Sequence, residues 1–177
     1  MSGHNKWGQI KHQKGIADVK RGALFSKLLK TISSAAKIEA DPEKNPRMRA
    51  LIETAKENLV PKENIERAIS RAGESKDLKE VTIEAYGPEK VAIIIECLTD
   101  NSNRTVAEVR NTLNENGGKM GEIGSAQWAF DNPSPGIWTP KFPQVISTEG
   151  EIKLTQLLEA LENHEDVQNI YTNSLKG

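Results

Sequence analysis

The residues best suited to chemistry lie at the start of the chain, where cationic and aromatic side chains alternate with small ones. The segment MSGHNKWGQIKHQKG places Trp7 and two histidines, His4 and His12, among lysines with few apolar neighbours. Ammonium groups pair with phosphates, and flat rings stack on unpaired bases with about 1–3 kcal/mol per base. This combination of residue types therefore favours nucleic-acid binding over packing in a core.

The distribution of charge supports the same interpretation. The whole chain has a formal net charge of −1, but residues 1–37 hold eight lysines and arginines against the single acid Asp18, a net charge of +7. Charges of one sign at this density repel each other, and a polyanion relieves that repulsion. A solvated basic helix face is the ordinary alternative, and the ring of Trp7 makes the polyanion the favoured partner.

The candidate contacts extend from this leader into the first predicted helices. Glycines such as Gly3 keep the leader pliable and allow a close approach of its backbone. The cationic candidates in the leader and the first helix are Lys6, Lys11, Lys14, Lys20, Arg21, Lys27 and Lys30. Arg47 and Arg49 add positive charge further along, although acids nearby largely offset it.

Catalytic and metal-binding patterns are not found in the sequence. Cys97 lies within the run VAIIIECL, which is typical of a thiol buried in a strand. His4, His12 and His164 are widely separated, and two histidines without a nearby thiolate make a weak zinc site. Gly117-Gly118 is better explained as a helix end than as a phosphate loop. We therefore predict a protein that is not an enzyme and that has no metal or cofactor.

Hydrophobic spacing divides the chain into a helical part and an α/β part. Apolar residues recur three and four apart over 23–72, which is typical of three short amphipathic helices. From residue 80 the chain is predicted to form strands at 81–86, 91–98, 124–130, 144–147 and 167–171 and helices at 105–116 and 152–161. Thr105 and Glu108 fit a capping box for the first of those two helices.

The order of these elements predicts an α+β fold. From residue 91 it is β-α-β-β-α-β, the ferredoxin-like arrangement, with one more strand in front. The prediction is a basic N-terminal segment at 1–22, a three-helix domain at 23–73, and a ferredoxin-like two-layer α/β domain at 80–177.

Long stretches of the chain resemble one known family. They include GHNKWGQIKHQKG, KRGALFSKL, DPEKNPRMRALIETAKENLVPKENIERAI, EAYGPEKVAIIIECLTDNSNRTVAEVR, NGGKMGEIGSAQWAF and LENHEDVQNIYTN. The family is YebC, which includes the mitochondrial translational activator of cytochrome c oxidase. The resemblance implies a protein without catalytic residues that acts on gene expression, by binding DNA or by acting on ribosomes at proline-rich stretches.

The resemblance also implies which residues contact nucleic acid. In the leader these are Gly3, His4, Lys6, Trp7, Lys11, His12 and Lys14. The contact would be extended by Arg21, Lys27, Arg47 and Arg49. Four further residues match a family motif to which we assign no functional role, with helix capping expected for its asparagines: Asn101, Asn103, Arg104 and Arg110.

The chain departs from the family pattern at one place. Family members have three domains, and the third is inserted between strands that correspond here to the segments ending near Phe130 and beginning near Gln144. Only NPSPGIWTPKFP joins those segments in this chain. We expect residues 132–143 to be a short linker in place of that domain, with the nucleic-acid contact retained.

The favoured function is a translation factor that contacts ribosomal RNA, with the ribosome as the larger partner. A flexible tip of lysines and Trp7 suits irregular or single-stranded RNA. A DNA-binding transcriptional regulator is the alternative, but the predicted helix at 62–72 carries Glu63 and Glu66 where groove contacts would lie. A protein-interaction module that docks through the sheet face is the second alternative.

The expected location is the cytoplasm, and an organelle is less favoured. The longest apolar run, Val91–Ile95, is far too short to span a bilayer, so no membrane partner is expected. We see no signal-peptide core either. The sequence sets no oligomeric state.

Overall fold

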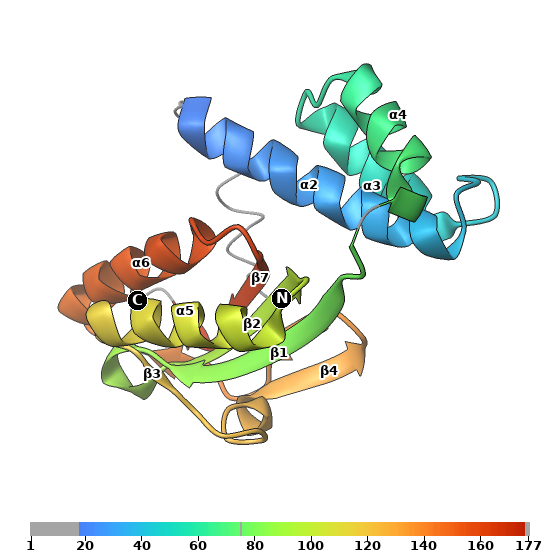
Figure 1. The fold of residues 1–177 in the computed structure, drawn as a ribbon. Helices are drawn as coiled ribbons and strands as arrows, with labels where there is room; N and C mark the ends of the chain where they lie inside the picture. The colour runs from blue at the N-terminus through green and yellow to red at the C-terminus, as the bar shows by residue number, and fades with distance from the viewer. Residues whose placement is uncertain (1–17, 75, 176–177) are drawn as a thin grey trace. The chain divides into compact units, whose positions relative to one another are not determined.

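The computed structural model describes residues 18–74 and 76–175 and is drawn in Figure 1. The described chain forms two compact units that divide between Leu78 and Lys79. We call residues 18–78 the helical unit and residues 79–175 the α/β unit. The predicted fold class, a helical region followed by an α/β region, is confirmed.

The helical unit consists of α2 (Asp18–Ile38), α3 (Pro46–Glu57), α4 (Lys62–Ser70) and the short 3-10 turn η1 (Ala72–Glu74). Asn45 caps α3, because its side-chain oxygen accepts a hydrogen bond from the Met48 backbone nitrogen at 3.0 Å. The core of this unit includes Ile32, Ala55 and Ile65, each at most 4% exposed. Within the described residues, no helix is both long enough and apolar enough to cross a membrane.

The first helix begins earlier than the periodicity predicts. α2 starts at Asp18, so residues 18–22, which the sequence assigned to the leader, are helical. The apolar repeat begins only at Ala23. Lys20, Arg21 and Gly22 are exposed, and hydrophobic periodicity gives no signal for exposed residues at a helix start.

The α/β unit contains two long helices, a four-stranded sheet and several short pairings. Its long strands and helices are β1 (Lys79–Tyr86), β2 (Ala92–Thr99), α5 (Ser102–Glu115), α6 (Thr148–Glu162) and β7 (Val167–Thr172). Its short elements are η2 (Pro88–Lys90), β3 (Lys119–Met120), η3 (Gln127–Ala129), β4 (Phe130–Ser134), β5 (Ile137–Pro140), β6 (Gln144–Val145) and β8 (Ser174–Leu175).

The four-stranded sheet has the order β3-β1-β2-β7, and all neighbours are antiparallel. β2 and β3 are therefore parallel and lie on either side of β1, which makes β2-α5-β3 the split unit of a ferredoxin-like sheet. The strand between them is β1, which precedes β2 in the chain, and the predicted strands at 124–130 and 144–147 contribute nothing to this sheet.

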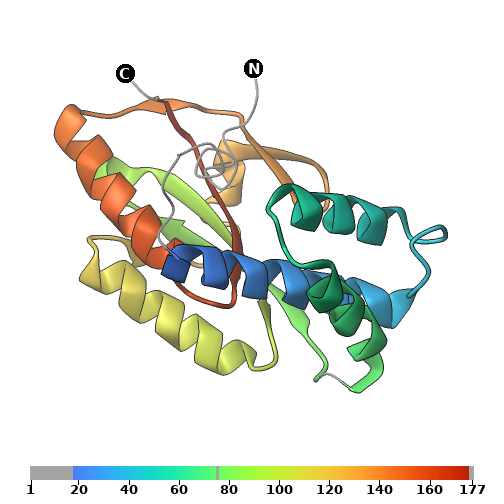
Figure 2. The same ribbon diagram turned by 90° about the horizontal axis from the view of Figure 1, so that it is seen from above.

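Both faces of the sheet are covered. Figure 1 shows α5 and α6 on one face and β4 on the other, and in Figure 2 the two helices lie side by side. The helix side encloses a core that includes Ile93, Ile95 and Leu157. The opposite side encloses a second core in which Ile94 packs with Trp138 and other side chains. The sequence predicted two layers, and the β4–β5 hairpin adds cover on the second face.

Several predicted local features are wrong. Residues 132–143 are not a plain linker, because β4 and β5 pair there as a hairpin. β6 lies in the predicted strand at 144–147 but pairs in parallel with β8 outside the main sheet. α5 begins at Ser102 behind the cap Asn101, so Thr105 is inside the helix and does not cap it. The prediction of a buried Cys97 thiol is confirmed, at 2% exposure in β2.

Tyr171 on β7 makes the stability of the α/β unit sensitive to alkaline pH. Its buried hydroxyl donates to the Gly136 carbonyl at 2.8 Å, and burial, with a smaller contribution from Glu96, raises the pKa of Tyr171 above its ordinary value of 10.0. The folded state therefore holds this proton more tightly than the unfolded chain. Stability from this group is complete below pH 10 and falls above it.

We expect the free energy of unfolding, measured by urea titration with Trp fluorescence, to fall as the pH rises above about 10. Tyr171→Phe should be less stable at neutral pH, because it loses a hydrogen bond, but should show a shallower decline. An identical decline in the two proteins would contradict this assignment.

Candidate nucleic-acid interface

Most of the predicted nucleic-acid contacts lie outside the described residues. These are Gly3, His4, Lys6, Trp7, Lys11, His12 and Lys14. Their roles stay predictions, and the structure adds only the positions that follow them on α2 and α3.

The basic residues of α2 differ in their exposure. Lys20 and Arg21 are exposed near the start of the described helix, and Lys30 is half-buried. Lys27 is only 3% exposed, so the prediction that it continues a surface stripe is wrong. Helical periodicity identifies the apolar face of α2, but it does not identify what covers the flank on which Lys27 lies.

The two predicted arginines of α3 are both exposed, but Arg49 also supports its own loop. Its guanidinium donates to the carbonyl oxygens of Pro42 and Glu43 at 3.3 and 3.2 Å. A guanidinium has five N–H donors, so these two contacts do not exhaust it. Arg47, two residues after the cap Asn45, lies at the exposed start of α3.

Arg104 organises a polar cluster that the sequence did not explain. Its Nη2 donates to Asp166 Oδ2 and to Asp100 Oδ1, each at 3.0 Å, and the Thr105 hydroxyl donates to the same Asp166 oxygen at 2.7 Å. Asp166 is 1% exposed, and its hydrogen bond with Arg104 raises the pKa of that guanidinium. The cluster therefore ties the first turns of α5 to the start of β7.

The cap of α5 accounts for one more residue of the family-like motif. The Asn101 side chain accepts from the Arg104 backbone nitrogen at 3.2 Å, which confirms the predicted capping role for this asparagine. Asn103 and Arg110 are exposed on the same helix.

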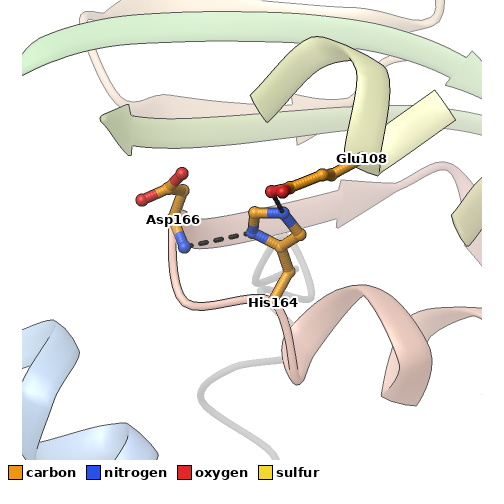
Figure 3. A group of neighbouring side chains, drawn as sticks. All are labelled: Glu108, His164 and Asp166. Atoms are coloured by element: carbon orange, nitrogen blue, oxygen red, sulfur yellow. Dashed lines mark hydrogen bonds and ion pairs between the residues drawn. The ribbon is translucent and has the colours of Figure 1, made fainter. Parts of the chain in front are cut away.

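His164 lies beside this cluster with both ring nitrogens engaged. Figure 3 shows its ring between Glu108 of α5 and the backbone nitrogen of Asp166. That backbone nitrogen donates to Nδ1 at 3.1 Å, so Nδ1 is an acceptor and the proton lies on Nε2, which faces Glu108 Oε2 at 2.9 Å.

Ligand-type atoms of Glu108, His164 and Asp166 lie within 4.8 Å of one another, a spacing that would suit a metal ion. However, neither imidazole nitrogen keeps a lone pair for a metal in this arrangement, and the Asp166 carboxylate is held by Arg104 and Thr105. The chemistry of the three groups fits a hydrogen-bonded brace better than a metal centre.

A hollow of about 610 Å³ lies near the start of α6. Among its lining residues are three acids, Glu89, Glu115 and Glu149, and one lysine, Lys153. Glu89 also closes the start of α6, because its carboxylate accepts from the backbone nitrogen of Ser147 at 3.1 Å. Three carboxylates repel phosphate, so this hollow does not suit a polyanion.

A buried carboxylate shapes the loop at 121–129. Glu84 on β1 is 4% exposed and accepts hydrogen bonds from the backbone nitrogens of Gly124, Ala126 and Gln127 at 2.5, 2.7 and 3.0 Å. The Gln127 side chain donates a fourth, at 2.8 Å. Because these backbone donors converge on one side chain, they are not available to a neighbouring strand. The predicted strand at 124–130 therefore starts only at Phe130.

The same loop presents Trp128 to solvent, next to Phe142 from the segment between β5 and β6. Trp128 is 56% exposed and Phe142 is 51% exposed, and their ring centroids are 5.7 Å apart. The Trp128 indole nitrogen donates to the Tyr86 hydroxyl at 3.1 Å, and that hydroxyl donates to the Ser125 carbonyl. We call Trp128 and Phe142 the aromatic patch. The sequence analysis missed it, because Trp128 and Phe142 are separated along the chain by β4 and β5 and only the fold brings their rings together.

Comparison with known proteins gives matches along most of the chain. A family model described as the TACO1/YebC protein N-terminal domain matches residues 5–75, and one described as the TACO1/YebC second and third domain matches residues 78–134. A solved structure, a conserved hypothetical protein from Aquifex aeolicus, is 31% identical with a TM-score of 0.85, and the match covers 97% of each chain.

Two relatives carry the description probable transcriptional regulatory protein. The one from Geobacter sulfurreducens is 53% identical over 135 residues, which is 74% of this chain and 55% of the relative. The one from Trichlorobacter lovleyi is 46% identical over 164 residues, or 90% of this chain and 62% of the relative. The chain thus spans little more than half the length of the curated relatives it matches.

The polar cluster at Arg104 yields a stability prediction. Arg104→Gln removes the guanidinium that bonds to the buried Asp166 carboxylate, and we expect a loss of about 2–3 kcal/mol in the free energy of unfolding, measured by urea titration. Arg110→Gln on the exposed face of the same helix is the matched control and should change stability by less than about 0.5 kcal/mol. Equal stability of the two variants would show that the cluster is not a brace.

Proposed function

The chain belongs to the TACO1/YebC family, and we propose that it regulates gene expression by binding nucleic acid through its basic N-terminal segment. The observation that carries this proposal is the net charge of +7 over residues 1–37 in a chain whose overall net charge is −1. Such a segment lowers its electrostatic free energy when a polyanion approaches. The exposure of Lys20, Arg21 and Arg47 is compatible with that contact.

Our favoured form of this function is a translation factor that contacts ribosomal RNA in the cytoplasm. Trp7 and the lysines around it suit unpaired bases and irregular backbones more than the regular groove of a duplex. α4 begins with Lys62 and Glu63 and carries Glu66, so its exposed start is not uniformly basic. A recognition helix needs a basic or neutral surface toward the phosphates on either side of a groove.

Transcriptional regulation through DNA is the second candidate, and the descriptions of the relatives favour it. Docking of a protein through the open sheet face has less support, because helices cover one face and the β4–β5 hairpin packs on the other. Binding is also favoured over catalysis. The titratable clusters around His164 and Glu84 are hydrogen-bonded within the fold.

We also propose where in this fold the longer relatives carry their additional domain. The ends of the β4–β5 hairpin are paired, with Phe130 opposite Pro140. A whole domain can enter between two paired strand ends without moving the sheet below them, because the ends are already adjacent. The extra domain of the relatives would thus join this fold at the hairpin, which lies within the segment predicted from the sequence.

The salt dependence of RNA binding tests the leader. With about five phosphate contacts, the affinity for a fluorescein-labelled single-stranded RNA should fall with a log–log slope of roughly −3.5 in KCl. Replacing Lys6, Lys11 and Lys14 with Gln should reduce that slope by roughly 2, since each contact contributes about 0.7. Fluorescence anisotropy across a KCl series gives both slopes.

Lys44, Lys56 and Lys62, exposed in the helical unit, form the matched control when changed together to Gln. This triple variant removes the same charge and should keep the full slope. Equal slopes for the two triple variants would refute the leader as the contact. Competition then separates the two candidate functions. Ribosomes should displace the labelled RNA if the protein is a translation factor, and promoter duplex DNA should displace it more effectively if the protein is a transcriptional regulator.

A further inference from the structure

The loop that carries Trp128 is held in place by Glu84, a buried charged residue that apolar packing does not stabilise. Glu84 lies beneath the loop, and a buried carboxylate is costly unless hydrogen bonds compensate it. Four N–H groups of the loop supply that compensation. The loop therefore keeps its shape without help from its outward apolar side chains, which include Ile123 at 97% exposure as well as Trp128.

Folding does not require the rings to be where they are. Trp128 and Phe142 belong to neither buried cluster of the α/β unit, whereas the nearby Phe130 and Trp138 do. Phe130 and Trp138 pack edge to face at 6.3 Å beneath the surface. The unit thus has an aromatic pair that stabilises its core and a second pair that remains in solvent.

The exposed pair is also fixed in orientation. The indole nitrogen of Trp128 is anchored on the Tyr86 hydroxyl, which is itself bonded to the Ser125 carbonyl. Phe142 lies against Trp128 with an angle of 35° between the ring planes. Rings that are already ordered lose little side-chain entropy when a flat ligand stacks on them.

Two ammonium groups lie beside the patch. Lys141 Nζ is 5.9 Å from the Phe142 ring centroid, and its ion pair with Asp131, at 3.4 Å, is exposed and therefore weak. Lys119 is the register partner of Tyr86 on β3, so it lies on the same face of the sheet as the tyrosine that anchors Trp128. Aromatic rings with lysines beside them can bind a nucleotide, because the rings stack on the base and the ammonium groups pair with the phosphate.

We propose that the aromatic patch is a second nucleic-acid contact, at which Trp128 and Phe142 stack on unpaired bases of a single strand while Lys119 and Lys141 approach its phosphates. This inference rests on the proposed function for the class of partner, but it uses a different site and a different force. Asp131 pairs with Lys141, and Glu122 lies three residues after Lys119 in the chain, so the four residues together carry no net charge. Stacking therefore supplies most of the affinity here, and the contact should depend less on salt than the contact of the leader.

Affinity measurements with two variants of the full chain test this proposal. Trp128→Ala should weaken binding of a single-stranded oligonucleotide by about 5- to 150-fold, the equivalent of about 1–3 kcal/mol, with an unchanged salt slope. Trp128→Leu keeps an apolar side chain but removes the π-face, so it should bind as weakly as the alanine variant. Ile152→Ala, which shortens an exposed apolar side chain on α6, is the control and should bind normally.

Fluorescence gives a direct reading of the stacked ring. In a Trp7→Phe background the remaining tryptophans are the exposed Trp128 and the buried Trp138. A saturating oligonucleotide should quench the exposed component and shift its emission. The quenching should vanish when Trp128→Phe is added, and circular dichroism verifies that each variant is folded.

The outcomes separate this proposal from the preceding one. If Trp128→Ala binds like the wild type while the leader variants lose salt dependence, the patch proposal is wrong and the leader stands. If Trp128→Leu binds normally while Trp128→Ala does not, the contact is apolar, as for a protein partner, and stacking is refuted. A leader variant with the full salt slope, combined with weak binding by Trp128→Ala, would overturn only the leader. No binding by the full chain at low salt would overturn both.

Discussion

Strand β2 is apolar on both faces, and the architecture of the α/β unit follows from the need to cover both. Ile93 and Ile95 point to one side and Ile94 to the other, and all three are fully buried. A buried side chain of this size stabilises the fold by about 1.5–3 kcal/mol. α5 and α6 cover the first face, and the β4–β5 hairpin covers the second. A chain with only two helices behind its sheet would leave Ile94 in water.

Two buried carboxylates determine the conformation of segments that apolar packing alone does not fix. Asp166 fixes where α5 meets β7, because Arg104 and Thr105 both bond to it. Glu84 fixes the loop between β3 and β4, because four N–H groups converge on it. Hydrophobic contacts are non-directional, whereas these hydrogen bonds have defined geometry. The carboxylates therefore set the conformation of segments whose own side chains bury little.

The two proposed contacts divide the work of binding between two forces. The leader offers charge, which acts over roughly 10 Å and is screened by salt. The aromatic patch offers ring faces, which act only at contact and ignore salt. A protein with both would be drawn to any polyanion but held best where bases are unpaired. That combination suits a partner such as structured RNA, in which paired and unpaired segments lie close together.

The sequence by itself determined the helical and α/β division, the approximate place of every long helix and strand, and the family. These features depend on hydrophobic periodicity and on local motifs, which neighbouring residues carry. Tertiary structure alone decided that β1 lies between β2 and β3, that Lys27 is buried, and that Trp128 remains exposed. Each of those depends on a partner far away in the chain. Glu84 is the clearest case. An acid at a polar position of an alternating strand predicts a side chain that faces solvent, and only the fold places the N–H groups of a loop some 40 residues later in the chain against this carboxylate.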